Sequence, residues 1–160
     1  MITLKNMKEI IEKLINNHQT ISTMESCTGG SLANSITNIE GSSEVFNFSA
    51  ITYSNDFKVK MGVSKDIIDA YSVYSFEVAN EMSKNISKFT NSDYGVGITG
   101  KLNRIDINNP YGQDDLVYIS ICDKSKDITY NDNVKCTKDN RMANKELVIN
   151  KVVEMLKEII

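Results

Sequence analysis

Helical and strand patterns alternate along this chain, and their order is the feature that most restricts its possible folds. Apolar residues recur with a helical period over residues 5–18 and 75–89, and in a C-terminal segment that carries Ile149 to Ile160. Shorter helices are predicted from Thr28 to near Gly41 and over residues 55–61 and 65–70, the last capped by Ser64. Strands are predicted over residues 20–25, 45–53, 94–99, 116–122 and, nearer an edge, 127–136. This order predicts an α/β fold, a three-layer α/β/α sandwich with a mixed, mostly parallel sheet.

Length and charge limit the kinds of partner that are expected. A chain of 160 residues suits a single domain, residues 1–160. The formal net charge is -3 and no basic stripe with interleaved aromatics occurs, so nucleic acid is not an expected partner. No apolar run is long enough to span a bilayer and the N-terminus has no secretory pattern, so we expect a cytoplasmic protein without membrane contact. A homodimer is plausible, since two-fold dimers are the commonest oligomers.

The cysteines and the single histidine restrict the possible chemistry. Cys27, Cys122 and Cys136 match no zinc or haem spacing, so we expect reduced thiols in or near the core. His18 is the only histidine, at the end of a predicted helix, which makes a Ser-His-Asp triad a weak hypothesis. A multi-histidine metal site is impossible within one chain, and we expect no metal and no cofactor.

The segment "ESCTGG", residues 25–30, joins a predicted strand to a predicted helix and leaves three interpretations open. Unpaired N–H groups at a helix start favour an anion, and glycines let a ligand approach the backbone, so the turn is a candidate phosphate site. Ser26 is a candidate nucleophile. The turn can also be purely structural, because it contains none of the "GxxxxGK[ST]", "GxGxxG" or "GxSxG" patterns.

A nucleophilic serine requires a base, and without histidine the remaining option is a lysine whose pKa is lowered. The segment "TYSNDFK", residues 52–58, offers Tyr53 at a predicted strand end and Lys58 about one helical turn later. Burial would lower the pKa of such a lysine, because it disfavours the charged form. Taken alone, however, strand-end tyrosines and surface lysines are common.

Five motifs in this order resemble the CinA C-terminal domain family. They are "ESCTGG" at 25–30, "GSS" at 41–43, "TYSNDFK" at 52–58, "VYSFEVANEM" at 73–82 and "GITG" at 97–100. The family includes stand-alone nicotinamide mononucleotide deamidases, and its full-length relatives carry a separate N-terminal domain. The resemblance therefore implies a stand-alone amidohydrolase that converts nicotinamide mononucleotide and water into nicotinate mononucleotide and ammonia. It also implies a three-layer α/β/α fold and no metal.

The resemblance places the family's serine, tyrosine and lysine on Ser26, Tyr53 and Lys58. Ser26 would attack the carboxamide carbon, and Lys58, or Tyr53 near it, would accept the serine proton. Backbone N–H groups around Thr28 to Gly30 would stabilise either the oxyanion or the substrate phosphate. The expected substrate-binding residues are Glu25, Thr28, Gly29, Gly30, Thr99, Gly100 and Arg141. Glu25 could instead orient the lysine or cap the turn, and Thr28 could be only an N-cap.

One long irregular segment, residues 100–115, departs from the family pattern. Relatives usually have a small-residue loop here, whereas this chain has "GKLNRIDINNPYGQDD", in which Lys101, Arg104 and Asp106 could fill the space of a ligand. The late "GDR" of relatives is "KDNR" at 138–141, where Arg141 is the candidate phosphate contact. Two alternatives therefore stay open: an amidase with a different substrate, and a non-catalytic binding or regulatory protein.

Overall fold

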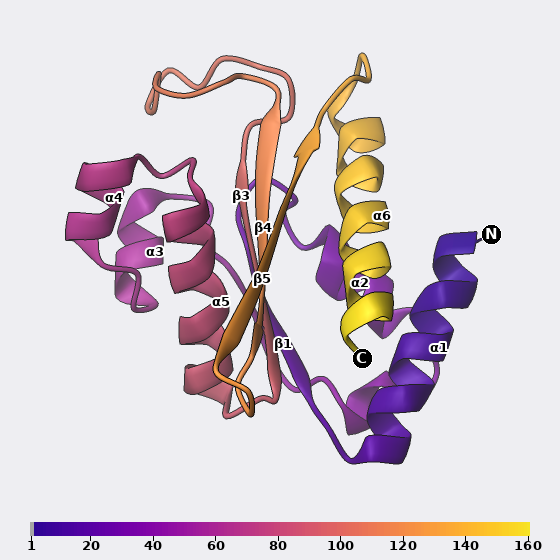
Figure 1. The fold of residues 1–160 in the computed structure, drawn as a ribbon. Helices are drawn as coiled ribbons and strands as arrows, with labels where there is room; N and C mark the ends of the chain where they lie inside the picture. Colours follow the sequence, from indigo (N-terminus) through magenta and orange to yellow (C-terminus); the bar gives the residue numbers. More distant parts are fainter. Residues whose placement is uncertain (1) are drawn as a thin grey trace.

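A five-stranded sheet lies between two layers of helices, as Figure 1 shows with the sheet close to edge-on. The computed structural model describes residues 2–160. Its helices are α1 (Ile2–Asn17), α2 (Ser31–Thr37), the 3-10 helix η1 (Ser42–Glu44), α3 (Asn55–Lys60), α4 (Lys65–Tyr71), α5 (Phe76–Thr90) and α6 (Arg141–Ile159). Its strands are β1 (Ile21–Glu25), β2 (Ser49–Ile51), β3 (Tyr94–Gly100), β4 (Leu116–Asp123) and β5 (Ile128–Lys135). The predicted α/β/α sandwich is confirmed.

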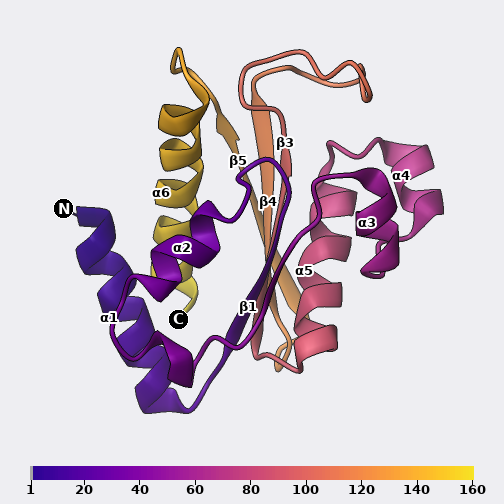
Figure 2. The same cartoon turned by 180° about the vertical axis from the view of Figure 1, so that it is seen from behind.

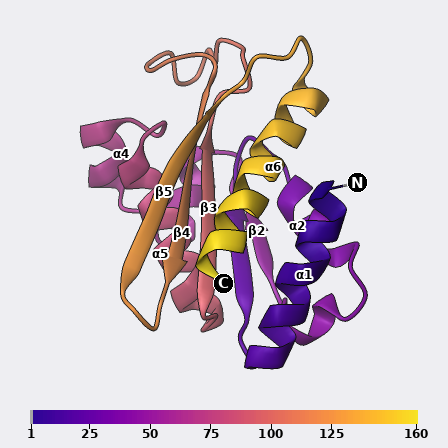
Figure 3. The same cartoon turned by 45° about the vertical axis from the view of Figure 1, so that its right-hand side comes forward.

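The strand order in the sheet is β2-β1-β3-β4-β5 (Figure 3). Strand β1 pairs in parallel with β2 and β3, whereas β4 pairs antiparallel with β3 and β5. The sheet is therefore mixed, and β4 alone runs against the other four strands. All five residues of β1 are buried, as expected for a strand with a neighbour on each side and helices on both faces.

Helices α1, α2 and α6 cover one face of the sheet, and α3, α4 and α5 cover the other (Figure 2). The first layer packs Leu14 and Leu32 against Val96 and Ile98 of β3. None of the helices within residues 2–160 combines the length and the apolar character needed to cross a membrane. The two helix layers thus cover the faces of the sheet, whereas the ends of its strands are not part of these apolar contacts.

Glycines on β3 allow α5 to lie unusually close to the sheet. A Cβ added at Gly97 would lie 2.4 Å from the backbone oxygen of Ala79 and 2.7 Å from the amide nitrogen of Ser83. At Gly95 it would lie 2.2 Å from the backbone oxygen of Ser83. The glycine-containing strand predicted from the sequence therefore has a packing reason for its composition.

The predicted strand over residues 45–53 is shorter in the structure, where β2 holds only Ser49–Ile51. The amides of Val45 and Phe46 both donate to the carbonyl of Ser42, which closes the 3-10 turn of η1. The alternation of Phe46 and Phe48 with polar residues has another origin, because Phe46 packs on the core and Phe48 contacts Phe89 with ring centroids 5.5 Å apart. The pattern was thus apolar packing in an irregular segment rather than strand pairing.

Replacing Gly97 by alanine should destabilise the protein by about 3 kcal/mol, because the added methyl meets backbone atoms of α5 that cannot move independently. Urea denaturation followed by circular dichroism measures this change. The exposed Ser43→Ala serves as the control and should leave the midpoint unchanged. A Gly97→Ala midpoint equal to that of the control would show that α5 can move away at little cost.

Candidate active site

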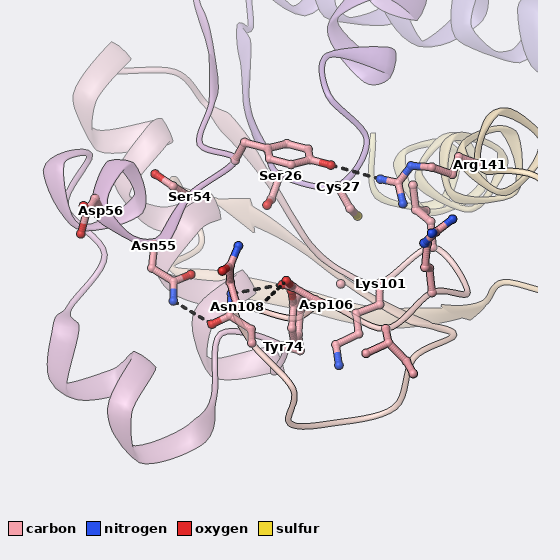
Figure 4. A pocket seen from close by; sticks show the side chains of 16 residues that line it. Ser26, Cys27, Ser54, Asn55, Asp56, Tyr74, Lys101, Asp106, Asn108 and Arg141 are labelled. Carbon is pink, nitrogen blue, oxygen red and sulfur yellow. Dashed lines mark hydrogen bonds between the residues drawn. The ribbon is translucent and has the colours of Figure 1, made fainter.

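A polar pocket of about 500 Å³ opens at the carboxyl ends of the parallel strands. Ser26 directly follows β1, Tyr53 lies just beyond β2, and Gly100 ends β3. Its other lining residues are Cys27, Ser54, Asn55, Asp56, Tyr74, Lys101, Leu102, Arg104, Ile105, Asp106, Asn108, Asn109 and Arg141 (Figure 4). This edge is where ligands usually bind in open α/β sheets, and the volume suits a small molecule.

Lys58 of α3 reaches back to the end of β1. Its Nζ lies 2.9 Å from Ser26 Oγ and 2.7 Å from the backbone oxygen of Thr52. Helix α3 begins directly after β2, because Ser54 caps it by accepting a hydrogen bond from the amide of Phe57. The register of β1 with β2 therefore brings together the serine and the lysine that the family resemblance had paired.

The Lys58 side chain is buried at 2% exposure, which is rare for a lysine. Burial disfavours its charged form and lowers its pKa from 10.5 to about 8, while the nearby Cys27 and Asp106 oppose that change. A substantial fraction of Lys58 is therefore neutral near pH 8. A neutral amine whose hydrogen is held by the carbonyl of Thr52 can direct its lone pair to the Ser26 hydroxyl.

Tyr53 lines the pocket but contacts a different residue. Its side chain is 63% exposed, and its hydroxyl accepts a hydrogen bond of 3.1 Å from Nη2 of Arg141 (Figure 4). No hydrogen bond joins Tyr53 to Ser26 or Lys58 within residues 2–160. Of the two candidate bases named from the sequence, only Lys58 is in hydrogen-bonding contact with the serine.

Glu25 caps α2 instead of facing the pocket. Its fully buried carboxylate accepts hydrogen bonds from the amides of Leu32 and Ala33, at 2.9 and 3.0 Å, and from the hydroxyl of Thr28 at 2.7 Å. A carboxylate at a helix start satisfies unpaired N–H groups and the helix dipole. The side chains of Glu25 and Thr28 were expected to bind substrate, and the structure corrects this: neither residue lines the pocket, and of the two only the backbone amide of Thr28 remains a candidate contact.

Gly29 and Gly30 form the turn between Ser26 and α2. Their φ angles are 60° and 100°, in the left-handed region that other residues rarely adopt, and neither lines the pocket. The expectation that these glycines bind substrate is therefore wrong. Their role is to allow the left-handed backbone of the turn. The predicted helix start at Thr28 moves to Ser31 for the same reason.

The backbone amides of the turn divide into occupied and available donors. The amide of Gly29 donates to the carbonyl of Ser26 at 3.0 Å. Among the hydrogen bonds within residues 2–160, the amides of Cys27 and Thr28 have no acceptor. An oxyanion beside Ser26 would thus find candidate donors in the two amides that follow the serine.

The "GITG" residues have different roles. Thr99 is fully buried and donates to the carbonyl of Val73, so its side chain fixes the segment before α5 and does not line the pocket, contrary to expectation. Gly100 lines the pocket as expected. A Cβ there would lie 2.4 Å from Cα of Val117, so β4 also requires the glycine.

The three cysteines are buried free thiols, as predicted. Cys27 lines the pocket beside Ser26, but burial raises its pKa to about 12. Its thiolate is therefore scarce at neutral pH, and it is the Ser26 hydroxyl that contacts Lys58. Within residues 2–160 no cluster of three His, Cys, Asp or Glu side chains could hold a metal.

Several pocket residues were not identified from the sequence. Asn55 donates to the side-chain oxygen of Asn109 at 2.9 Å, and the hydroxyl of Tyr74 donates to Asp106. The pairs are separated by 54 and 32 residues, so no local spacing indicates them. Only Lys101, Arg104 and Asp106 of the irregular segment had a compositional signal, and all three line the pocket.

The fold and the site define an α/β/α protein with a buried serine–lysine pair at the mouth of a polar pocket. The sequence matches the CinA C-terminal domain over residues 4–160, and the chain belongs to this family. A CinA-like protein of Endomicrobium trichonymphae is 38% identical over 128 residues, which cover 78% of this chain and 29% of that relative. A Clostridium acetobutylicum protein that bears the name "Putative competence-damage inducible protein" is 38% identical over 146 residues, which cover 88% of this chain and 32% of that relative.

Solved structures have the same fold. The CinA superfamily protein of Escherichia coli superposes with a TM-score of 0.86 at 22% identity, over 99% of this chain and 90% of that one. The competence/damage inducible protein CihA of Agrobacterium tumefaciens gives 0.79 at 25% identity, over 94% and 93% of the chains. This chain spans only about a quarter to a third of the length of the curated relatives above.

Replacing Glu25 by glutamine should destabilise the protein by about 2 kcal/mol, since the amide NH₂ would meet an N–H of α2 and a charge-assisted bond is lost. Urea denaturation at pH 7 measures the loss. Glu44→Gln, at an exposed position, is the matched control. Equal stability of the two variants would mean that the Glu25 carboxylate is not the cap of α2.

Proposed function

We propose that this protein is an amidohydrolase that hydrolyses the carboxamide of nicotinamide mononucleotide to nicotinate mononucleotide and ammonia. The observation that carries the proposal is the 2.9 Å contact between Nζ of the buried Lys58 and Oγ of Ser26. A lysine with a lowered pKa beside a serine is an arrangement that activates a hydroxyl without histidine. The chain's membership of the CinA C-terminal domain family supports the choice of substrate.

The chemistry proceeds through an acyl-enzyme. Ser26 Oγ attacks the carboxamide carbon as its proton passes to Lys58 Nζ, and the amides of Cys27 and Thr28 donate to the oxyanion. Collapse of the tetrahedral species breaks the C–N bond, and Lys58 returns the proton to the leaving ammonia. Water then attacks the acyl carbon with Lys58 as base, which releases the carboxylic acid and regenerates Ser26.

The charged groups of the pocket suit a substrate that carries a negative charge at one end and a positive charge at the other. In Figure 4 Arg141 lies at one end, Asp56 and Asn55 lie at the other, and Ser26 lies between them. Nicotinamide mononucleotide carries an anionic phosphate and a cationic pyridinium ring. Arg141, already oriented by Tyr53, is the candidate phosphate ligand, because a guanidinium can bind phosphate through two donors.

Purified protein should release ammonia from nicotinamide mononucleotide, and Ser26→Ala and Lys58→Met should each lower kcat about a thousandfold or more, because each removes one member of the nucleophile–base pair. A coupled ammonia assay measures the rates. Ser43→Ala and Lys60→Ala, at exposed positions, are the matched controls. Full activity in Ser26→Ala would refute the mechanism.

A substrate panel separates this activity from that of an amidase with another preference. Nicotinamide riboside, which lacks the phosphate, should react more slowly, and Arg141→Lys should raise KM for the mononucleotide more than it lowers kcat. Ammonia released faster from another amide would identify a different substrate. No turnover of any amide, together with an unreactive Ser26, would favour a binding or regulatory role.

The rate should depend on pH through Lys58. The base must be neutral, and its lowered pKa of about 8 means that the protonated form dominates below that value. We therefore expect kcat/KM to fall about tenfold per pH unit below pH 8 and to level off above it. Initial rates from pH 6 to 10 test this, and a profile that rises towards acid would exclude a lysine base.

A further inference from the structure

Residues 101–115 form one wall of the pocket as an extension of β3 and β4. The amide of Lys101 donates to the carbonyl of Leu116, and the amide of Arg104 donates to the carbonyl of Asp114, each at 3.0 Å. Beyond these contacts the segment has no strand pairing, so side chains must hold its tip in place.

Asp106 is the residue that holds it. One carboxylate oxygen accepts from the hydroxyl of Tyr74 and from the side-chain amide of Asn109 at 3.2 Å, and the other accepts from the amide of Asn108 at 3.0 Å. Asn109 in turn accepts from Asn55, the first residue of α3. The tip is thereby tied to the segment between α4 and α5 and to the helix that carries the lysine of the active site.

Asp106 also bears on the charge of Lys58. Burial is the main influence on the Lys58 pKa and lowers it, while Cys27 and Asp106 oppose that change. The Cys27 thiol is neutral near pH 8, because burial raises its pKa to about 12, so Asp106 is the one of the two that carries a negative charge there. The nearby Lys101 pairs with another acid, since its Nζ lies 3.2 Å from Asp114 and 5.0 Å from the centre of the Tyr74 ring. In the view of Figure 4, Asp106 lies between Ser26 and Tyr74.

We propose that Asp106, held by Tyr74, is a positioning residue: it fixes residues 101–115 as the wall opposite Ser26 and places a carboxylate where it acts on Lys58. The proposal rests on the function proposed above, since it assigns Asp106 an effect on the same nucleophile–base pair. It predicts that removing the Tyr74 hydroxyl and removing the Asp106 charge shift the pKa of Lys58 in opposite directions. Loss of the Tyr74 hydroxyl releases the segment from Asp106, and we expect water to reach Lys58 as a result. Loss of the Asp106 charge keeps an acceptor for Tyr74, leaves the lysine buried and removes a group that favours its protonated form.

Tryptic cleavage of the bond between Arg104 and Ile105 measures how firmly the segment is held, without any substrate. Tyr74→Phe should be cleaved about tenfold faster than the wild type, because a hydrogen bond to a carboxylate is lost. Asp106→Asn keeps an acceptor for Tyr74 and should be cleaved only about threefold faster. Tyr71→Phe and Asp66→Asn, at exposed positions, are the matched controls and should be cleaved at the wild-type rate.

The pH dependence of Ser26 sulfonylation by phenylmethanesulfonyl fluoride, followed by mass spectrometry, measures the second effect. In this step Ser26 Oγ bonds to sulfur, fluoride leaves and Lys58 accepts the proton. Tyr74→Phe should shift the rising limb to higher pH, because water restores the protonated form of Lys58. Asp106→Asn should shift it to lower pH, because a negative charge near the lysine is lost.

Opposite shifts with faster cleavage of Tyr74→Phe support the proposal, because general loosening would move both limbs to higher pH. Shifts in the same direction, unchanged limbs or unchanged cleavage overturn it. Labelling of Ser26 with no ammonia from nicotinamide mononucleotide would refute the proposed substrate and leave this test valid. If the wild type is not labelled at all, the nucleophile fails and the effect of Asp106 on the reaction fails with it.

Discussion

The contact of Lys58 with Ser26 and with the carbonyl of Thr52 is the interaction on which the site depends. A buried lysine is costly unless its polar hydrogens have acceptors, and both acceptors here lie just beyond parallel strands, β1 and β2. The contact therefore forms only when the two strands are paired and α3 begins immediately after β2. The same burial that costs stability lowers the lysine pKa, so fold and chemistry are linked through one side chain.

The N-terminus of α2 shows how one physical argument can have two outcomes. Unpaired amides and the helix dipole attract an anion, and the sequence suggested that the anion is a ligand. The structure supplies it internally, since the Glu25 carboxylate occupies the amides of Leu32 and Ala33. Within residues 2–160 the amides that immediately follow Ser26 have no such partner, and this separates the donors that stabilise the helix from those available to an oxyanion.

Periodic patterns predicted the layers, the long helices and the central strands, because burial on one helix face or on both faces of a strand restricts residue type position by position. The pairing of Ser26 with Lys58 was implied by the family resemblance, whereas the residues alone left the turn open as a structural, anion-binding or nucleophilic element. For Glu25 and Thr28 the sequence left a capping role and a ligand contact as alternatives, and Thr99 was assigned to the ligand. The identity of a buried acid or hydroxyl residue does not tell whether it contacts a ligand or the backbone. Nor could the tie from Asn55 to Asn109 be predicted, since it depends on where the ends of β2 and β3 lie in space.

The serine–lysine pair and most of the pocket wall come from different parts of the chain. The proposed nucleophile directly follows β1 and the proposed base lies on α3, elements that belong to the helix and sheet layers, whereas residues 101–115 extend past the end of the sheet and are held by polar side chains. Changes in that segment can alter the pocket without disturbing the core, which is why loops at this edge can vary while the scaffold persists. Asp106 limits this independence. On the inference that its charge favours the protonated form of Lys58, a change that reshapes the pocket wall at this position would also change the strength of the proposed base.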